Sequence, residues 1–135
     1  IPRASIHVIA AEHGAVAAAA QYTYSLQDVG PFDLVLLGLG EDGHTASLFP
    51  GDDWGSDTDA PDALAIAGAP KPPAERVSLS AARLRRARNV LFLVTGASKR
   101  EAVARWRRGD TLPAAAIRPA AGVDVLLTAD LLESG

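Results

Sequence analysis

The stretch FDLVLLGLGEDGHTASLFPG, residues 32–51, decides the fold of this 135-residue chain. It opens with the apolar run 34–37, whose lack of polar alternation predicts a strand buried on both faces, as at the centre of a parallel sheet. Gly38, Gly40 and Gly43 then let the backbone turn sharply and let a ligand come close to it. Because ligands of open α/β sheets bind beyond the carboxyl ends of the strands, we expect the chemistry of this protein at this loop.

Segments with strand and helix patterns alternate along the rest of the chain. The expected strands cover residues 5–9, 63–69, 76–80, 89–95 and 123–127, and the expected helices cover residues 12–27, 81–88, 99–108 and 129–133, with helical turns at 45–48 and 113–117. Ser80 is placed to cap the helix at 81–88. Residues 52–62 read as an exposed loop, and the Pro-rich stretch 70–73 as extended chain. The recurrence of strand, glycine-containing loop and helix predicts a single α/β domain over residues 1–135 with a mainly parallel sheet.

The composition is that of a packed globular protein, with 48% hydrophobic residues and a mean hydropathy of +0.11. The absence of cysteine excludes disulfides and thiolate metal sites, and is typical of a reducing compartment. A net charge of −3 gives no general attraction to nucleic acid or to anionic lipid. No apolar run approaches the roughly 18 residues of a membrane span. We therefore expect a cytoplasmic protein with neither a nucleic-acid nor a membrane partner.

Two arginine clusters, at residues 83–88 and 105–108, raise the question of nucleic-acid binding. We interpret both as solvated helix faces, because the chain is acidic overall and Trp106 is the one aromatic residue among them. The segment 38–43 also matches the dinucleotide fingerprint G-x-G-x-x-G. Its two acidic residues would face a pyrophosphate, and no long helix clearly follows it, so this match is a weak sign of nucleotide binding.

His44 is the first candidate for catalysis. Its position just after an expected buried strand favours a functional role, and a neutral imidazole can take a proton from water or from a hydroxyl group. The alternative is a structural histidine held by Asp42 in a tight loop. His7 and His13 have no ligand spacing with His44, so we expect no metal here.

Lys99 is the first candidate for binding an anion. It follows the expected strand at 89–95 and lies at the expected start of a helix, where free amides, the helix dipole and an ammonium group all favour a negative charge. Arg76, beside the rigid segment 70–73, could reach the same anion. The alternatives are a solvated lysine and a surface salt bridge.

Taken together, these residues resemble the 6-phosphogluconolactonase family. The most specific signature is GLGEDGHTASLFPG at 38–51. It is followed in order by PKPPAERVSLS at 70–80, LFLVTGASK at 91–99 and LPAAAIRP at 112–119. The segment before the signature, which includes His7, is also similar, so the resemblance covers nearly the whole chain.

The resemblance implies a Rossmann-like three-layer α/β sandwich with a mainly parallel sheet, shared with glucosamine-6-phosphate deaminases. The implied reaction is hydrolysis of 6-phospho-D-glucono-1,5-lactone to 6-phosphogluconate in the pentose phosphate pathway. His44 would act as general base with Asp42 orienting it, and Lys99 and Arg76 would hold the phosphate. From the loop chemistry we expect amides around Gly40 and Gly43 to steady the oxyanion. No cofactor or metal is implied, because a lactone is an activated ester.

Two other functions stay open. Deaminases of the same fold carry a Glu five residues after the His, whereas this chain has Phe49, which cannot transfer a proton. A non-catalytic sugar-phosphate-sensing domain is the second alternative, although a sensor has no need for Asp42 and His44 together.

The chain also departs from the family pattern. A Gly-Gly-Ser phosphate loop and an Asp-Glu-Arg motif, both N-terminal in the family, are missing here, so we expect this chain to be the C-terminal portion of a longer enzyme, truncated or partly lost. The last strand also differs, with Leu127-Thr128-Ala129-Asp130 where the family usually has an Asp directly after the apolar run. Exposed strand edges would favour self-association, which makes the expected state a monomer or a homodimer.

Overall fold

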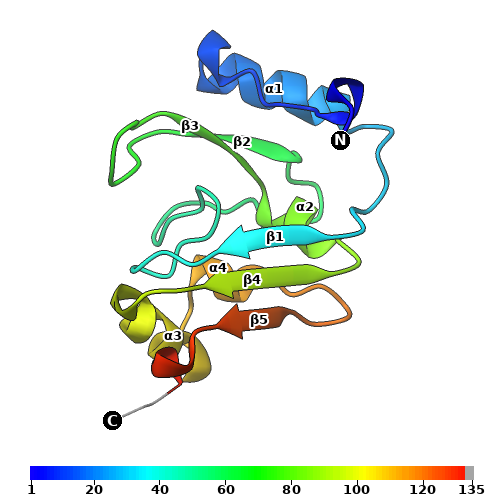
Figure 1. Ribbon diagram of the computed structural model, residues 1–135. Helices are drawn as coiled ribbons and strands as arrows, with labels where there is room; N and C mark the ends of the chain where they lie inside the picture. The colour runs from blue at the N-terminus through cyan, green and yellow to red at the C-terminus, as the bar shows by residue number, and fades with distance from the viewer. Residues whose placement is uncertain (133–135) are drawn as a thin grey trace.

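The computed structural model describes residues 1–132, and its centre is a sheet of three parallel strands (Figure 1). The strands lie in the order β1-β4-β5, with β1 at Val35–Gly38, β4 at Val90–Val94 and β5 at Asp124–Leu127. All three are short and rich in Val and Leu, as strands of parallel sheets are. This confirms the α/β class and the parallel sheet.

Three helices cover one face of this sheet. They are α2 (Ala81–Arg85), α3 (Arg100–Arg107) and α4 (Pro113–Ala116). Their small apolar side chains pack against the strands around Phe92, which is fully buried and meets the edge of Trp106 at 4.8 Å between ring centroids. The Ser80 hydroxyl caps α2 as predicted, since it accepts a hydrogen bond from the Arg83 N–H at 3.1 Å.

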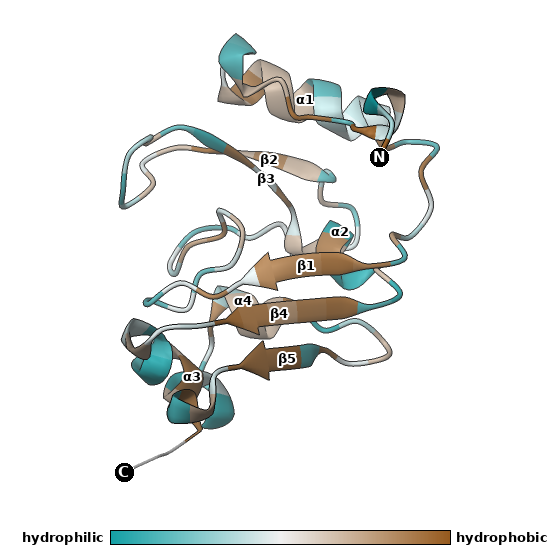
Figure 2. Cartoon of the chain, viewed as in Figure 1, coloured by the Kyte–Doolittle hydropathy of each residue, from teal (hydrophilic) through white to brown (hydrophobic). Residues whose placement is uncertain are grey.

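The other face of the sheet is open in this chain. Leu36, Leu93 and Leu126 point to that side and are 59%, 46% and 63% exposed. Figure 2 shows the three strands as the most hydrophobic part of the ribbon. The prediction that β1 is a central strand buried on both faces is therefore wrong for this chain, because β1 lies at an edge of the sheet and β4 lies in the middle.

A second sheet, not predicted as a separate unit, lies beside the first. It is an antiparallel hairpin of β2 (Ala63–Ile66) and β3 (Arg76–Leu79), so the two expected strands exist but pair with each other. Helix α1 (Ala15–Ser25) packs on this hairpin (Figure 1). The Thr23 hydroxyl ties α1 to β2 because it accepts a hydrogen bond from the Ala63 N–H at 3.0 Å.

Three further predictions are wrong. The expected strand at 5–9 does not form; Arg3–Ser5 is a 3-10 turn (η1), and Ile6 and Val8 after it are exposed. Residues 45–48 form no helical turn, because Thr45 and Leu48 make an antiparallel bridge instead. Arg83 is not on a solvated face, since it is 4% exposed. Its guanidinium donates to the carbonyls of Val29 and Gly30.

The remaining helices follow the prediction with shifted bounds. Short 3-10 segments precede α1 at Ala11–His13 (η2) and precede α3 at Ala97–Lys99 (η3). A last one, η4, spans Ala129–Leu131, and the predicted helix end at Glu133 lies outside the described residues. Within the described chain, the helices are all too short to cross a membrane.

Candidate active site

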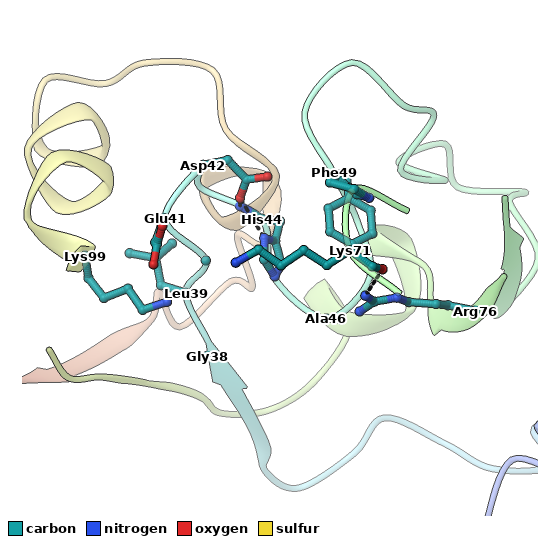
Figure 3. A pocket seen from close by; sticks show the side chains of 12 residues that line it. Gly38, Leu39, Glu41, Asp42, His44, Ala46, Phe49, Lys71, Arg76 and Lys99 are labelled. Carbon is teal, nitrogen blue, oxygen red and sulfur yellow. Dashed lines mark hydrogen bonds and ion pairs between the residues drawn. The ribbon is translucent and has the colours of Figure 1, made fainter. Parts of the chain in front are cut away.

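A cavity of about 520 Å³ opens at the carboxyl end of β1 (Figure 3). One wall is the loop that follows β1, from Gly38 to Phe49, and the opposite wall is the segment from Pro70 to Arg76 that joins β2 to β3. Lys99, which precedes α3, closes a third side. The cavity therefore lies where parallel α/β sheets place their ligands.

His44 and Asp42 form a hydrogen-bonded pair in this cavity. Nδ1 of His44 lies 2.6 Å from Oδ1 of Asp42, and the same oxygen accepts a hydrogen bond from the His44 backbone N–H at 3.0 Å. Because Nδ1 faces the carboxylate, Nε2 is the ring nitrogen left to meet a substrate. Burial alone would raise the pKa of Asp42, but the backbone and side-chain hydrogen bonds of His44 outweigh it and leave that pKa below its ordinary value. The carboxylate is thus charged at neutral pH and can hold the imidazole in one orientation.

Gly40 and Gly43 determine the shape of the loop, and their backbone N–H groups are hydrogen-bonded within it. The Gly40 N–H donates to the His44 carbonyl at 2.8 Å, and the Gly43 N–H donates to the Gly40 carbonyl at 3.0 Å. Gly43 has φ +91°, and a Cβ there would meet Leu112 at 2.7 Å. These two N–H groups are therefore engaged within the loop, and the expectation that amides around Gly40 and Gly43 steady an oxyanion stays a prediction. Gly40 lines the cavity, whereas Gly43 faces the start of α4.

Phe49 forms an apolar wall beside the imidazole. Its ring is 4% exposed and lies 4.8 Å from the His44 ring, between centroids. The Arg76 guanidinium carbon lies 5.5 Å from the centre of the same ring. The indole N–H of Trp54 donates to the Phe49 carbonyl at 2.6 Å and holds this part of the loop in place. Water access to one side of His44 is thereby reduced.

The predicted binding residues are brought together, but not around one point. Lys99 and Arg76 both line the cavity, and Figure 3 shows them at opposite sides of it, with His44 between them. Two N–H groups of Arg76 already donate to backbone carbonyls, those of Lys71 at 2.7 Å and Pro73 at 3.0 Å.

Sequence reasoning missed two charged residues of the cavity, Lys71 and Glu41. Figure 3 shows Lys71 extending from the opposite wall toward His44, and Glu41 beside Lys99. The available signal for Lys71 was its place as the one cation among the prolines of 70–73. Within residues 1–132, no three acidic or histidine side chains gather in a way that would hold a metal ion.

The chain is an α/β protein with a parallel sheet, and the first strand of that sheet leads into an Asp-Gly-His loop. The cavity beside this loop is lined by two lysines and an arginine, which makes it a site for a small anionic ligand. The chain matches the family model described as glucosamine-6-phosphate isomerases/6-phosphogluconolactonase over residues 1–126. It belongs to that family, which confirms the resemblance carried by the motifs.

Named relatives are consistent with this membership. Human 6-phosphogluconolactonase is 35% identical over 134 residues, covering 90% of this chain and 50% of the human protein. The solved 6-phosphogluconolactonase from Thermotoga maritima matches with a TM-score of 0.83 and 26% identity, over 94% of this chain and 57% of that one. The enzyme from Trypanosoma brucei matches with a TM-score of 0.70 and 32% identity, over 97% and 56%. The chain thus spans about half the length of these relatives.

Proposed function

We propose that this protein hydrolyses 6-phospho-D-glucono-1,5-lactone to 6-phospho-D-gluconate, with His44 as the general base. The observation that carries the proposal is the 2.6 Å contact between Nδ1 of His44 and Oδ1 of Asp42 in the cavity at the carboxyl end of β1. The carboxylate fixes the ring and stabilises the imidazolium formed when Nε2 takes a proton from water. The names of the family relatives supply the substrate.

Lys99 is the proposed ligand of the 6-phosphate. It is half-buried, lines the cavity, and precedes the first turn of α3, whose dipole and amides favour an anion. Arg76 adds positive charge from the other side of the cavity. A phosphate held at Lys99 would fix the position of the sugar ring and leave its carbonyl near His44, which lies between these two cations in Figure 3.

Phe49 favours lactone hydrolysis over an isomerase or deaminase reaction. Its buried ring contacts His44 at the position where the resembling deaminases carry a proton-transferring Glu. An aromatic ring has no proton to exchange, whereas hydrolysis needs only the base and a water molecule. A site that only senses sugar phosphates would not need a carboxylate hydrogen-bonded to the imidazole.

The test is hydrolysis of freshly made 6-phosphogluconolactone at neutral pH, measured against the spontaneous rate. His44→Ala should remove the acceleration, since general-base catalysis contributes about 10²–10⁴-fold. His13→Ala is the matched control, because His13 lies outside the cavity. Acceleration that survives His44→Ala would exclude His44 as the base, and the absence of acceleration by the unmodified chain would contradict the proposed activity.

A further inference from the structure

Lys71 and Glu41 are the charged residues of the cavity without a role in the proposed reaction, and Lys71 is the cation of the two. It lines the cavity together with His44, but it comes from the other wall, the β2–β3 connection. In the view of Figure 3 its side chain crosses the imidazole of His44 and its ammonium nitrogen ends on the side where Lys99 lies. An ammonium group that lines the cavity next to His44 can reach the carbonyl oxygen of a substrate bound there.

The backbone around Lys71 is fixed by Arg76. The Arg76 guanidinium donates to the Lys71 carbonyl at 2.7 Å and to the Pro73 carbonyl at 3.0 Å. The flanking prolines restrict the same segment further, because each proline ring locks its φ angle. Arg76 also lies over Phe49, which contacts His44. A continuous set of contacts therefore relates the position of Lys71 to that of the base.

Addition of water to a lactone carbonyl places negative charge on the carbonyl oxygen, which a nearby hydrogen-bond donor or cation must stabilise. The amides of Gly40 and Gly43 themselves are used within the loop, in hydrogen bonds of 2.8 and 3.0 Å. Stabilisation of the developing oxyanion is commonly the largest single contribution to catalysis of acyl transfer. A cation that faces the base across the cavity can take this role.

We propose that Lys71 is the catalytic electrophile of this site and that Arg76 is the positioning residue that holds it, an inference that rests on the proposed lactone hydrolysis. His44 Nε2 removes a proton from water as the water oxygen bonds to C1 of the lactone. The carbonyl π electrons move to the carbonyl oxygen, whose negative charge Lys71 stabilises. The intermediate then collapses, the bond from C1 to the ring oxygen breaks, and the imidazolium returns its proton to that oxygen. The product is the open-chain acid, which ionises to the carboxylate.

The first test is binding, which does not require turnover. In 6-phosphogluconate a carboxylate replaces the lactone carbonyl, whereas glucitol 6-phosphate carries the same phosphate and no carboxylate. By titration calorimetry, Lys71→Met should weaken 6-phosphogluconate about tenfold or more and leave glucitol 6-phosphate within about twofold. The matched variant Lys99→Met should weaken both ligands. If Lys71→Met weakens the affinity for both ligands equally, Lys71 is a phosphate ligand. If it changes neither affinity, Lys71 is not part of the binding site. Each of these results overturns the proposal.

The second test is the rate of hydrolysis. Removal of an oxyanion-stabilising group lowers kcat by about 10²–10³-fold, and this loss should occur both with 6-phosphogluconolactone and with unphosphorylated glucono-1,5-lactone. Lys99→Met should impair only the phosphorylated substrate. If Lys71→Met retains kcat on both substrates, the electrophile assignment is overturned. If the unmodified chain binds both ligands but hydrolyses neither lactone, the proposed function fails while the binding test still decides where Lys71 acts. If it binds neither ligand, both proposals fail.

The role of Arg76 has its own readout. Arg76→Lys keeps the positive charge but cannot hold two carbonyls at once with a planar fork. It should reproduce the selective loss of 6-phosphogluconate seen in Lys71→Met and leave glucitol 6-phosphate bound. If Arg76→Lys binds both ligands with the affinity of the unmodified chain, Arg76 does not position Lys71. If its affinity for both ligands falls equally, Arg76 binds the phosphate instead.

Discussion

The imidazole of His44 occupies the space that a side chain at Gly40 would fill. A Cβ built on Gly40 would lie 2.0 Å from Nδ1 of His44 and 2.1 Å from Cε1. Glycine at this position is therefore required by the close approach of the ring, and the loop that follows β1 is folded around the imidazole of His44. The position of the imidazole depends on the absence of one methyl group.

Gly40→Ala should reduce hydrolysis about 100-fold or more while the chain stays folded, because a displacement of about 1 Å at a reacting group has this effect. Circular dichroism would verify the fold, and initial rates would measure the loss. Gly30→Ala is the control, since a Cβ there meets nothing within 4 Å. Full activity of Gly40→Ala would show that His44 acts from another position.

The pH dependence of stability follows from Asp42. Its pKa is lower in the folded chain than its ordinary value, so near pH 4 the unfolded chain binds more protons, and stability rises with pH there. The contribution of Asp42 is complete above about pH 5 and is lost as the pH falls through the lowered folded value. The free energies of unfolding of the unmodified chain and of Asp42→Asn should therefore differ more at pH 5 than at pH 3, because the contribution of Asp42 is lost between these values. A difference that grows on acidification would contradict the assignment.

Arg83 should matter for stability far more than the exposed arginines near it. Its side chain is 4% exposed and pairs with Asp62 at 3.4 Å, while its guanidinium carbon lies 4.2 Å from the centre of the Phe32 ring. Arg83→Met leaves Asp62 with one fewer partner and should lower the free energy of unfolding by about 3 kcal/mol. Arg88→Ala removes an exposed pair with Asp33 and should change it by less than about 1 kcal/mol. Urea denaturation of the two variants compares them directly, and equal effects would refute the buried role of Arg83.

Two neighbouring residues of β4 test whether one face of the parallel sheet is buried and the other exposed. Phe92 is fully buried, whereas Leu93 is 46% exposed on the open face. Phe92→Ala should lower the free energy of unfolding by about 3–5 kcal/mol, and Leu93→Ala by less than about 1 kcal/mol. Similar losses at both positions in chemical denaturation would mean that the open face is covered in solution.

The sequence predicts most of the elements that carry the site, for clear physical reasons. The apolar runs that become β1 and β4 are continuous, so their type does not depend on any partner. The pair of Asp42 and His44 is local, because two residues in a tight loop meet whatever the rest of the fold does. Ser80 is recognisable as a cap for the same reason.

The errors concern properties that depend on partners distant in the sequence. The segment 5–9 has the composition of a strand but no neighbouring strand with which to pair. Arg83 resembles its exposed neighbours in sequence, and only the approach of Val29, Gly30 and Asp62 makes it a buried residue. Lys71 cannot be assigned to the site from sequence alone, because its relation to His44 arises from the hairpin, which brings residues 70–76 to the cavity beside the loop after β1.

The cavity is bounded by two sheets that, in residues 1–132, share no strand pairing. Lys99 follows a strand of the parallel sheet, whereas Lys71 and Arg76 belong to the antiparallel hairpin. A bound sugar acid that contacts both lysines would be a crosslink between the two sheets. Binding would then raise the free energy of unfolding of the chain by about RT ln(1 + [L]/Kd). The midpoint temperature of unfolding would rise with it. The substrate would thus act as a structural element of this small protein.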